Sequence, residues 1–297
     1  MREADVLSVV GRRTVADVLL AGAERTPDRE LLVFDDLDGG VQRFSWREVL
    51  ARVNAVARAL ATAGIGPGDH VHLHLPNCPE FLFVWFGCAV RGAVMVPTNV
   101  ASSGPELEYI LGHVGAALSV TDAAGIDVVR CARQAAGVPD AVWRSDALPE
   151  ANGTDLPRAA VDAGADLAIM YTSGTTSRPK GVRVTHANYV FAGESVAAGL
   201  GLVPDDRFLV VLPLFHANAQ YYSVMSALVT GATVVLGARF SATGWVDTAI
   251  RHAATVGSLF AAPIRMILAK PSRPRWRSHD LRVVAFAQNL KIRRAHV

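Results

Sequence analysis

Apolar residues recur with helical spacing in the first half of the chain. Between Val49 and Leu60 they stand four, three and four residues apart, which places them on one face of a helix. The preceding Ser45-Trp46-Arg47-Glu48 fits a capping box, in which the serine and glutamate side chains each accept from a free backbone N–H. Gly64 can end the helix in a left-handed conformation. The pattern therefore predicts an amphipathic helix between Ser45 and Gly64.

Two more helix starts come next, with short β-branched runs between them. Asn77-Cys78-Pro79-Glu80 predicts a helix that runs to about Gly92, and Ser103-Gly104-Pro105-Glu106 predicts a third. Strand candidates are VHLHL, AVMVP and ALSVT, and later DLAIMYT, RFLVVLP, ATVVLG, TVGSLF and RVVAFA, with helices near residues 187–198 and 245–253. This alternation predicts an α/β fold of stacked, largely parallel sheets with helices. LLVFDDLDGGVQRFS instead predicts a hairpin, because two strand-like runs flank Asp38-Gly39-Gly40.

Residues 137–165 are rich in Pro, Gly, Asp and Asn and have no periodicity. We interpret them as a connecting segment between a subdomain of residues 1–136 and a second, phosphate-loop subdomain of residues 166–297.

The apolar run FLFVWFGCAV stops at Arg91 and is about half the length of the roughly 20 residues that span a membrane. It therefore predicts a buried helix.

Composition narrows the possible classes of protein. The 297 residues are 51% hydrophobic and 19% charged, with 29 Lys and Arg residues against 27 Asp and Glu residues. Such a chain can bury a sizeable core and has no electrostatic footprint for nucleic acid. Its three cysteines have no CxxC spacing, and its N-terminus has no long apolar run. We therefore expect a reduced, cytoplasmic protein without a membrane segment.

The stretch YTSGTTSRPKGV, residues 171–182, carries the most specific chemical signal. It comes after a strand, and Gly174 lets the main chain approach a ligand closely. Consecutive N–H groups in such a turn bind anions, hydroxyl groups add donors, and Lys180 adds a positive charge. A Walker loop needs GxxxxGK, then Ser or Thr, then a helix, whereas Lys180 is followed by Gly181 and the strand-like VRV. The stretch predicts a phosphate-binding loop of another kind, and a flexible polar turn is the alternative.

TSGTTSRPKGV followed by THAN resembles the phosphate-loop signature of the adenylate-forming enzymes. These include acyl-CoA synthetases, aryl-CoA ligases and the adenylation domains of peptide synthetases. Further segments resemble the same family over about residues 14–290, including FSWREVLARVNAVARALATAGIGPGDHVHLHLPNCPEF, VRGAVMVPTNVASSGPELEYIL and VLPLFHANA. Ser177-Arg178, FAGESV and LRVVAFAQNL are most similar to crotonobetaine/carnitine-CoA ligases.

The resemblance implies the family's large N-terminal domain and its two-step reaction. A carboxylate attacks the α-phosphate of ATP to give an acyl-adenylate and pyrophosphate, and the thiol of coenzyme A then displaces AMP. It also implies Mg²⁺ beside the phosphates. The acid would be small or polar, with a carnitine-like betaine as the first expectation. By the same resemblance, the residues that hold the β- and γ-phosphates are Thr172, Ser173, Gly174, Thr175, Thr176 and Lys180.

His216 ends the strand-like run VVLPLF, where a side chain can project into a cleft. The resemblance implies a catalytic-site histidine beside the acyl and adenylate groups, and a packed, hydrogen-bonded histidine is the alternative. The next residues, ANAQYY, depart from the glycine often found there in the wider family. Asn218 and Gln220 are therefore candidates for a polar acyl pocket.

Three other features carry weaker chemical signals. His70, His72 and His74 would lie on one strand face about 7 Å apart, whereas zinc ligands converge on one point, so we assign no metal ligands. KPSRPRWRSH, residues 270–279, is interpreted as a solvated basic loop, with contact to coenzyme A phosphates as the alternative. Cys78 and Cys88 are interpreted as buried small residues rather than nucleophiles.

The tail KIRRAHV does not match the segment that the family carries after LRVVAFAQNL. In the family, that segment holds a Thr-Glu pair, a ribose-binding aspartate, a hinge and a small domain with a catalytic lysine. We therefore expect a partial N-terminal domain without the C-terminal catalytic-lysine domain, and Lys180 does not take that lysine's role. Two functions stay open. One is an ATP-dependent acyl-CoA ligase completed by a missing segment or partner chain, and the other is a remnant that binds nucleotide or a partner without turnover.

Overall fold

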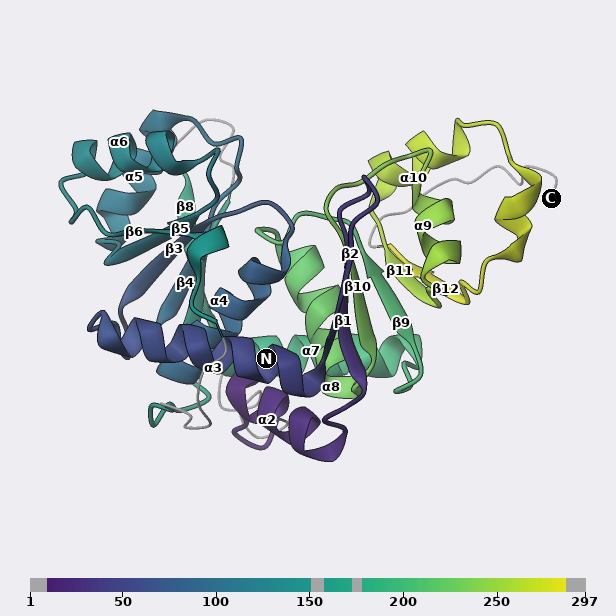
Figure 1. Cartoon of the computed structure of the whole chain (residues 1–297), viewed down its shortest axis with the longest axis horizontal. Coiled ribbons are helices and arrows are strands. Elements are labelled where there is room, and N and C mark those ends of the chain that lie inside the picture. Colours follow the sequence, from purple (N-terminus) through teal and green to yellow (C-terminus); the bar gives the residue numbers. More distant parts are fainter. Residues whose placement is uncertain (1–9, 151–157, 173–177, 287–297) are drawn as a thin grey trace.

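The computed structural model describes residues 10–150, 158–172 and 178–286, which form two sheets with helices between and around them (Figure 1). Sheet A has the strand order β12-β11-β9-β10-β1-β2, and sheet B has the order β6-β5-β3-β4-β7-β8. Neighbouring strands pair in parallel, except that β2 runs antiparallel to β1 and β8 antiparallel to β7. The predicted α/β fold of stacked, largely parallel sheets is confirmed.

The elements agree closely with the predicted segments. Sheet A contains β1 (Glu30–Asp35), β2 (Val41–Ser45), β9 (Arg207–Val210), β10 (Thr233–Gly237), β11 (Val256–Ser258) and β12 (Val283–Ala285). Sheet B contains β3 (His70–His74), β4 (Val94–Pro97), β5 (Leu118–Thr121), β6 (Val142–Arg144), β7 (Asp166–Thr172) and β8 (Lys180–Thr185). The longer helices are α2 (Val15–Arg25), α3 (Trp46–Thr62), α4 (Pro79–Arg91), α5 (Gly104–Val114), α6 (Ile126–Ala135) and α7 (His186–Leu200). The shorter ones are α8 (Met225–Thr230), α9 (Trp245–Arg251), α10 (Ala261–Leu268), η1 (Ser145–Ala147), η2 (Asn218–Val224) and η3 (Pro274–Ser278).

Each sheet takes strands from both halves of the chain. The predicted hairpin is present as β1 and β2, and it closes one edge of sheet A beside β10. Strands β7 and β8 close one edge of sheet B beside β4. The predicted subdomains, residues 1–136 and 166–297, therefore do not map one-to-one onto the two sheets. Residues 137–165 also contain β6, an edge strand of sheet B that is too short to show a period of two.

Helices α4, α7 and α8 lie between the two sheets (Figure 1). The apolar run of α4 is buried all round, as its sequence predicts for a helix covered on every side. Pro79 begins α4, and Gly92 ends it with φ +71°, where a side chain would also meet Val161. The predicted capping box of α3 forms between Ser45 and Glu48. Within the described residues, no helix is long and apolar enough to cross a bilayer.

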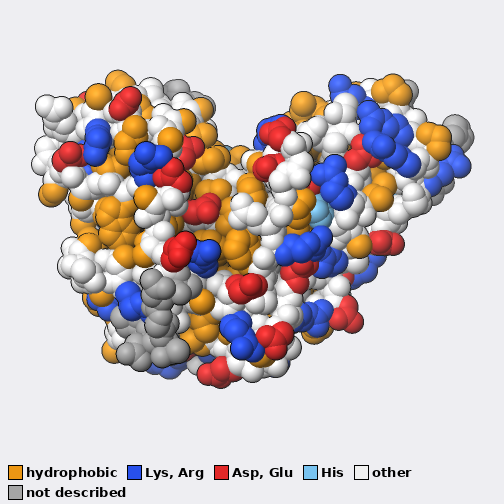
Figure 2. Space-filling model, in the orientation of Figure 1, with side chains coloured by type: hydrophobic (Ala, Val, Ile, Leu, Met, Phe, Trp, Pro, Cys, Tyr) orange, Lys and Arg blue, Asp and Glu red, His pale blue; other side chains and the backbone are white. Residues whose placement is uncertain are grey.

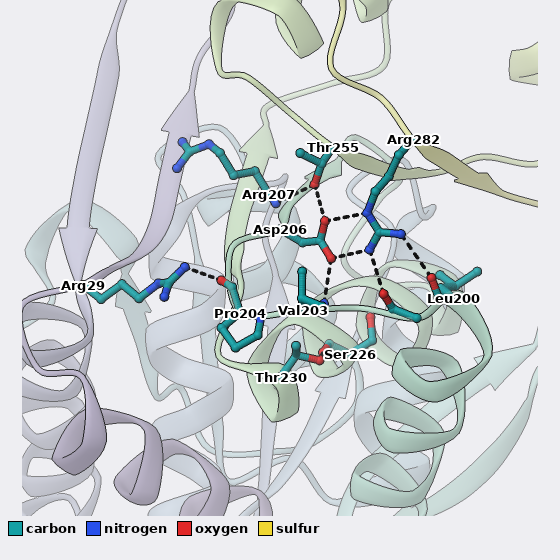
Figure 3. A network of polar contacts seen from close by, with 11 residues as sticks. Arg29, Leu200, Val203, Pro204, Asp206, Arg207, Ser226, Thr230, Thr255 and Arg282 are labelled. Atoms are coloured by element: carbon teal, nitrogen blue, oxygen red, sulfur yellow. Dashed lines mark hydrogen bonds and ion pairs between the residues drawn. The ribbon is translucent and has the colours of Figure 1, made fainter.

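An ion pair between the buried Asp206 and the partly exposed Arg282 ties together the amino ends of several strands of sheet A (Figure 3). Asp206, just before β9, accepts from Arg282 Nε at 2.9 Å, the Thr255 hydroxyl at 2.7 Å and the Val203 N–H at 2.8 Å. Arg282 also donates to the carbonyl of Gly201 at 2.9 Å, at the end of α7. The pair thereby links the starts of β9, β11 and β12 to the carboxyl end of α7.

The surface is hollowed between the part built around β3, β5 and β6 and the part that carries α9 and α10 (Figure 2). The four Lys and Arg residues of the predicted basic loop are exposed. Two of them contact Asp247 of α9, Arg273 at 3.0 Å and Arg275 at 2.5 Å. This agrees with a solvated loop whose charges are partly balanced by the protein itself.

Candidate functional site

A cavity of about 330 Å³ lies at the carboxyl ends of strands from both sheets. Sheet B supplies Thr98 and Asn99 after β4 and Thr172 at the end of β7, and sheet A supplies His216 after β9. Glu106 of α5 also lines the cavity. Ligands of open α/β sheets bind beyond the carboxyl ends of the strands, so this is the expected place for a site. The structure thus brings two of the sequence-predicted site residues, Thr172 and His216, to one cavity.

The predicted phosphate loop is closed at its base by a pair of antiparallel strands. Thr172, the last residue of β7, is the register partner of Lys180, the first residue of β8. Directly opposed residues of an antiparallel pair point to the same face, and both of these residues are exposed. The hairpin therefore presents the hydroxyl and the ammonium group on one side of the loop. Ser173, Gly174, Thr175 and Thr176 lie outside the described residues, so their predicted role stays a prediction.

A group of aromatic side chains anchors this hairpin to α5. The Tyr171 hydroxyl lies 2.5 Å from Nδ1 of His113, and the His113 ring stacks on Tyr109 with a centroid distance of 5.6 Å. Arg178, at the exit of the loop, lies over the Tyr109 ring at 5.2 Å. Burial raises the pKa of Tyr171 to about 12, so its hydroxyl remains protonated. Sequence reasoning missed this anchor, because Tyr109 and His113 look like ordinary helix positions until the fold places them beside β7.

His216 is exposed at the cavity wall, just before η2. Its ring packs on Phe215 with a centroid distance of 4.1 Å and has no hydrogen-bond partner among the described residues. Neighbouring protein atoms desolvate the imidazole and lower its pKa, so the ring is neutral at pH 7. The position agrees with a side chain that projects into a cleft rather than with a packed, hydrogen-bonded histidine.

The predicted polar pocket is wrong for Gln220. Its side chain is fully buried, and its amide accepts from the Tyr189 hydroxyl at 2.5 Å and donates to the Leu214 carbonyl at 2.5 Å. Because the side chain is buried and both ends of its amide bond protein groups, it does not line a pocket for a ligand. Asn218 accepts from the Ser258 hydroxyl at 3.0 Å and is not part of the described cavity wall.

Two of the three strand histidines belong to a buried polar network. His72 and His74 are at most 2% exposed, and both lie within hydrogen-bond distance of the Thr98 hydroxyl, at 2.8 and 2.9 Å. Ser119 contacts the other nitrogen of His72 at 3.0 Å and accepts from the buried Arg133 at 2.8 Å. Burial lowers the pKa of His72 to about 3, so the ring is neutral. Arg133 can only donate, so Ser119 accepts from it, and the network connects Arg133 through Ser119 and His72 to the Thr98 hydroxyl in the cavity wall.

The remaining chemical candidates agree with a structural role. Cys88 is fully buried, and burial raises its pKa to about 12. Burial also raises the pKa of Cys78, so both thiols are poor nucleophiles, as predicted. Across the described ranges, no three His, Cys, Asp or Glu side chains converge on a possible metal position.

The chain is similar to known proteins along most of its length. A family model described as AMP-binding enzyme matches residues 19–291. Crotonobetaine/carnitine–CoA ligases from Salmonella paratyphi A and Salmonella agona are 35% and 37% identical to this chain, and the matches cover 96% and 89% of it. The same matches cover 58% and 54% of those relatives, so the chain spans little more than half of their length.

Solved structures with the same fold include acyl-CoA synthetases. The N-terminal domain of FACL13 from Mycobacterium tuberculosis has a TM-score of 0.82 and 28% identity, over 92% of this chain and 69% of that one. O-succinylbenzoate coenzyme A synthetase from Bacillus subtilis, in complex with AMP, has a TM-score of 0.78 and 26% identity, over 91% of this chain and 67% of that one. The described part of this chain therefore has the fold of the N-terminal domain of adenylate-forming enzymes.

Proposed function

The chain belongs to the AMP-binding enzyme family, and from this premise we propose that it is an ATP-dependent acid–CoA ligase that forms an acyl-adenylate. The observation that carries the proposal is the shared cavity of Thr172 and His216. Thr172 ends β7 and begins the phosphate-loop signature, and His216 lies between β9 and η2 on the side of sheet A. The proposal is supported by the position of this cavity, because ligands of open α/β sheets bind beyond the carboxyl ends of the strands.

In the first step, an oxygen of the carboxylate attacks the α-phosphorus of ATP, and pyrophosphate leaves with the electrons of the broken P–O bond. In the second step, the sulfur of coenzyme A attacks the acyl carbon, the thiol loses its proton, and AMP leaves. The protein has to position ATP and offset the charge on its phosphates. We propose that the loop from Thr172 to Thr176, together with the Lys180 ammonium, holds the β- and γ-phosphates. His216 would lie beside the acyl and adenylate groups as a neutral ring.

The described residues do not build a metal site of their own, since they lack three converging ligands. Mg²⁺ is commonly held by substrate phosphates, water and one or two carboxylates. We therefore propose that the ion enters bound to ATP, as part of that substrate.

A small or polar acid is the proposed substrate. The cavity is small, and Thr98, Asn99 and Ser102 give part of its wall a polar character. Relatives named crotonobetaine/carnitine–CoA ligase point in the same direction. A carnitine-like betaine is therefore the first acid to test, and turnover of only long fatty acids or aryl acids would contradict the proposal.

The proposal is tested by ATP–pyrophosphate exchange with a panel of small carboxylic acids, together with calorimetric titration of ATP into the same sample. Exchange that requires an acid and is lost in Lys180→Ala is expected. Lys270→Ala serves as the control, because Lys270 is exposed in the basic loop, in the part of the chain after α10. ATP binding without exchange would instead support the second candidate, a protein that binds nucleotide without turnover. Neither signal from folded protein would contradict both.

A further inference from the structure

Asn77 joins the two sheets near the candidate cavity. It lies between β3 of sheet B and α4, and its side chain is buried. The amide nitrogen donates to the carbonyls of Leu212 and Gly237, each at 3.1 Å, and the amide oxygen accepts from the Leu214 N–H at 2.8 Å. Gly237 ends β10, and the two leucines come after β9, so one side chain from sheet B holds two segments of sheet A.

Leu214 is held at both of its backbone polar groups. Its N–H donates to Asn77, and its carbonyl accepts from Gln220, whose own amide oxygen accepts from the Tyr189 hydroxyl. Leu214, Gln220 and Tyr189 are at most 1% exposed. Buried backbone groups outside helices and sheets need such partners. Two side-chain amides, rather than regular secondary structure, therefore fix this part of the chain.

The segment held in this way carries His216. Leu214 stands two residues before His216, which lines the cavity together with Thr172 of sheet B. Asn77 also belongs to the sheet B side, so its amide sets how close the segment after β9 lies to the phosphate-loop hairpin. Capping of α4 does not explain the asparagine, because Cys78 is the N-cap residue and no side chain caps that helix.

We propose that Asn77 is a positioning residue for His216, and that it holds the histidine in the cavity by bonding Leu212, Leu214 and Gly237 across the two sheets. The importance of His216 rests on the proposed function, but the positioning itself does not. Aspartate cannot replace this asparagine, because it lacks the two N–H donors and would place a charge against two buried carbonyls.

The test is histidine-labelled NMR together with amide hydrogen exchange on the 297-residue chain. In Asn77→Ala, the Leu214 amide should exchange at least about tenfold faster than in the wild-type protein. The lowered pKa of His216 should rise toward its ordinary value of about 6.5, because the ring leaves its desolvated position. Glu106 and Tyr171, the other titratable groups of the cavity wall, are unchanged in this variant. His216→Gln identifies the His216 signal.

Asn54→Ala is the matched control. Asn54 is a buried asparagine of α3 whose amide oxygen has no hydrogen-bond partner among the described residues. It should leave both the Leu214 exchange rate and the His216 pKa unchanged. Equal values in the wild-type protein and in folded Asn77→Ala would overturn the inference. If Asn77→Ala does not fold, the wild-type protein still tests the hydrogen bonds of Asn77. Its two side-chain amide protons should exchange slowly with solvent. Fast exchange would contradict their burial against Leu212 and Gly237.

An activity measurement separates this inference from the proposed function. If the wild-type protein catalyses exchange, Asn77→Ala should lower kcat about tenfold or more while the calorimetric affinity for ATP changes less than about twofold, because Asn77 acts on His216 and not on the phosphate loop. Unchanged kcat with a shifted His216 pKa would overturn the functional part of the inference. If the wild-type protein shows no exchange, the proposed function fails, and the NMR results alone support or refute the positioning of His216.

Discussion

Replacing Asp206 with alanine is expected to lower the free energy of unfolding by about 3 kcal/mol. The residue is 2% exposed, and its carboxylate receives four hydrogen bonds, two of them from Arg282. Breaking a buried ion pair costs about 3–5 kcal/mol, because the remaining groups lose their partner. The lower end applies here, since the Arg282 side chain is 38% exposed and water can hydrate it when Asp206 is gone.

Urea unfolding of the wild-type protein, Asp206→Ala, Arg282→Ala and the double variant completes a double-mutant cycle. A coupling energy of at least about 1 kcal/mol is expected for groups in direct contact. The control is the exposed pair of Asp38 and Arg239, 3.0 Å apart, whose removal should leave the unfolding midpoint unchanged. A coupling energy near zero would refute the conclusion that Asp206 and Arg282 hold the amino ends of β9 and β12 together.

The same pair should contribute to the pH dependence of stability. Burial alone would raise the pKa of Asp206, but hydrogen bonds from Arg282, Thr255 and Val203 outweigh it and hold the pKa below the ordinary value. The unfolded chain therefore takes up this proton at a higher pH than the folded chain does. The contribution is fully present above about pH 4 and is lost as the pH falls toward the lowered pKa of the folded state. Asp206→Ala should lack this part of the acid dependence.

Three further predictions test the rest of the interior. Arg133→Met should lower the free energy of unfolding by about 3 kcal/mol in urea, because it leaves the Ser119 hydroxyl and the carbonyls of Ala116 and Pro139 without this donor. The exposed Arg130→Ala should have little effect. A thiol reagent should modify only the exposed Cys131 rapidly in the folded protein, because Cys88 is buried and the pKa of Cys78 and of Cys88 is raised, and fast modification of three thiols would contradict this. The urea midpoint should be lower at pH 5 than at pH 7. Burial lowers the pKa of His72 to about 3 and that of His186 to about 4. As the pH drops below about 6.5, only the unfolded chain therefore protonates these residues, and the folded state loses stability. Equal midpoints at the two pH values would count against neutral burial of these rings.

The regular elements were predictable because their signals are local. The capping box at Ser45, the proline that begins α4 and the left-handed Gly92 act within a few residues of each other in the chain. Strand β7 coincides with the predicted run DLAIMYT. The three-residue strand β6 could not be predicted, because it is held by pairing with β5 rather than by its own pattern.

The site was predictable only in part, for a physical reason. The phosphate-loop string is readable because it begins at the end of β7, and His216 because it follows the strand-like run VVLPLF, although β9 already ends at Val210. Gln220 was misread because a polar side chain next to a candidate site can equally satisfy buried backbone groups, and the sequence does not distinguish the two. Asn77 was read as part of a helix start, although its partners lie more than 130 positions further along the chain.

The amino ends and the carboxyl ends of the parallel strands have different roles in this fold. At the amino ends, Asp206 and Arg282 form a charged pair that touches no cavity residue and serves stability. At the carboxyl ends, the Asn77 amide bonds the Leu214 backbone, and the His72 and His74 rings, whose pKa values are lowered by burial, contact the Thr98 hydroxyl. Substitution of Asp206 should therefore change the unfolding midpoint but not the His216 titration. Substitution of Asn77 should change the His216 titration even under conditions in which the protein remains fully folded.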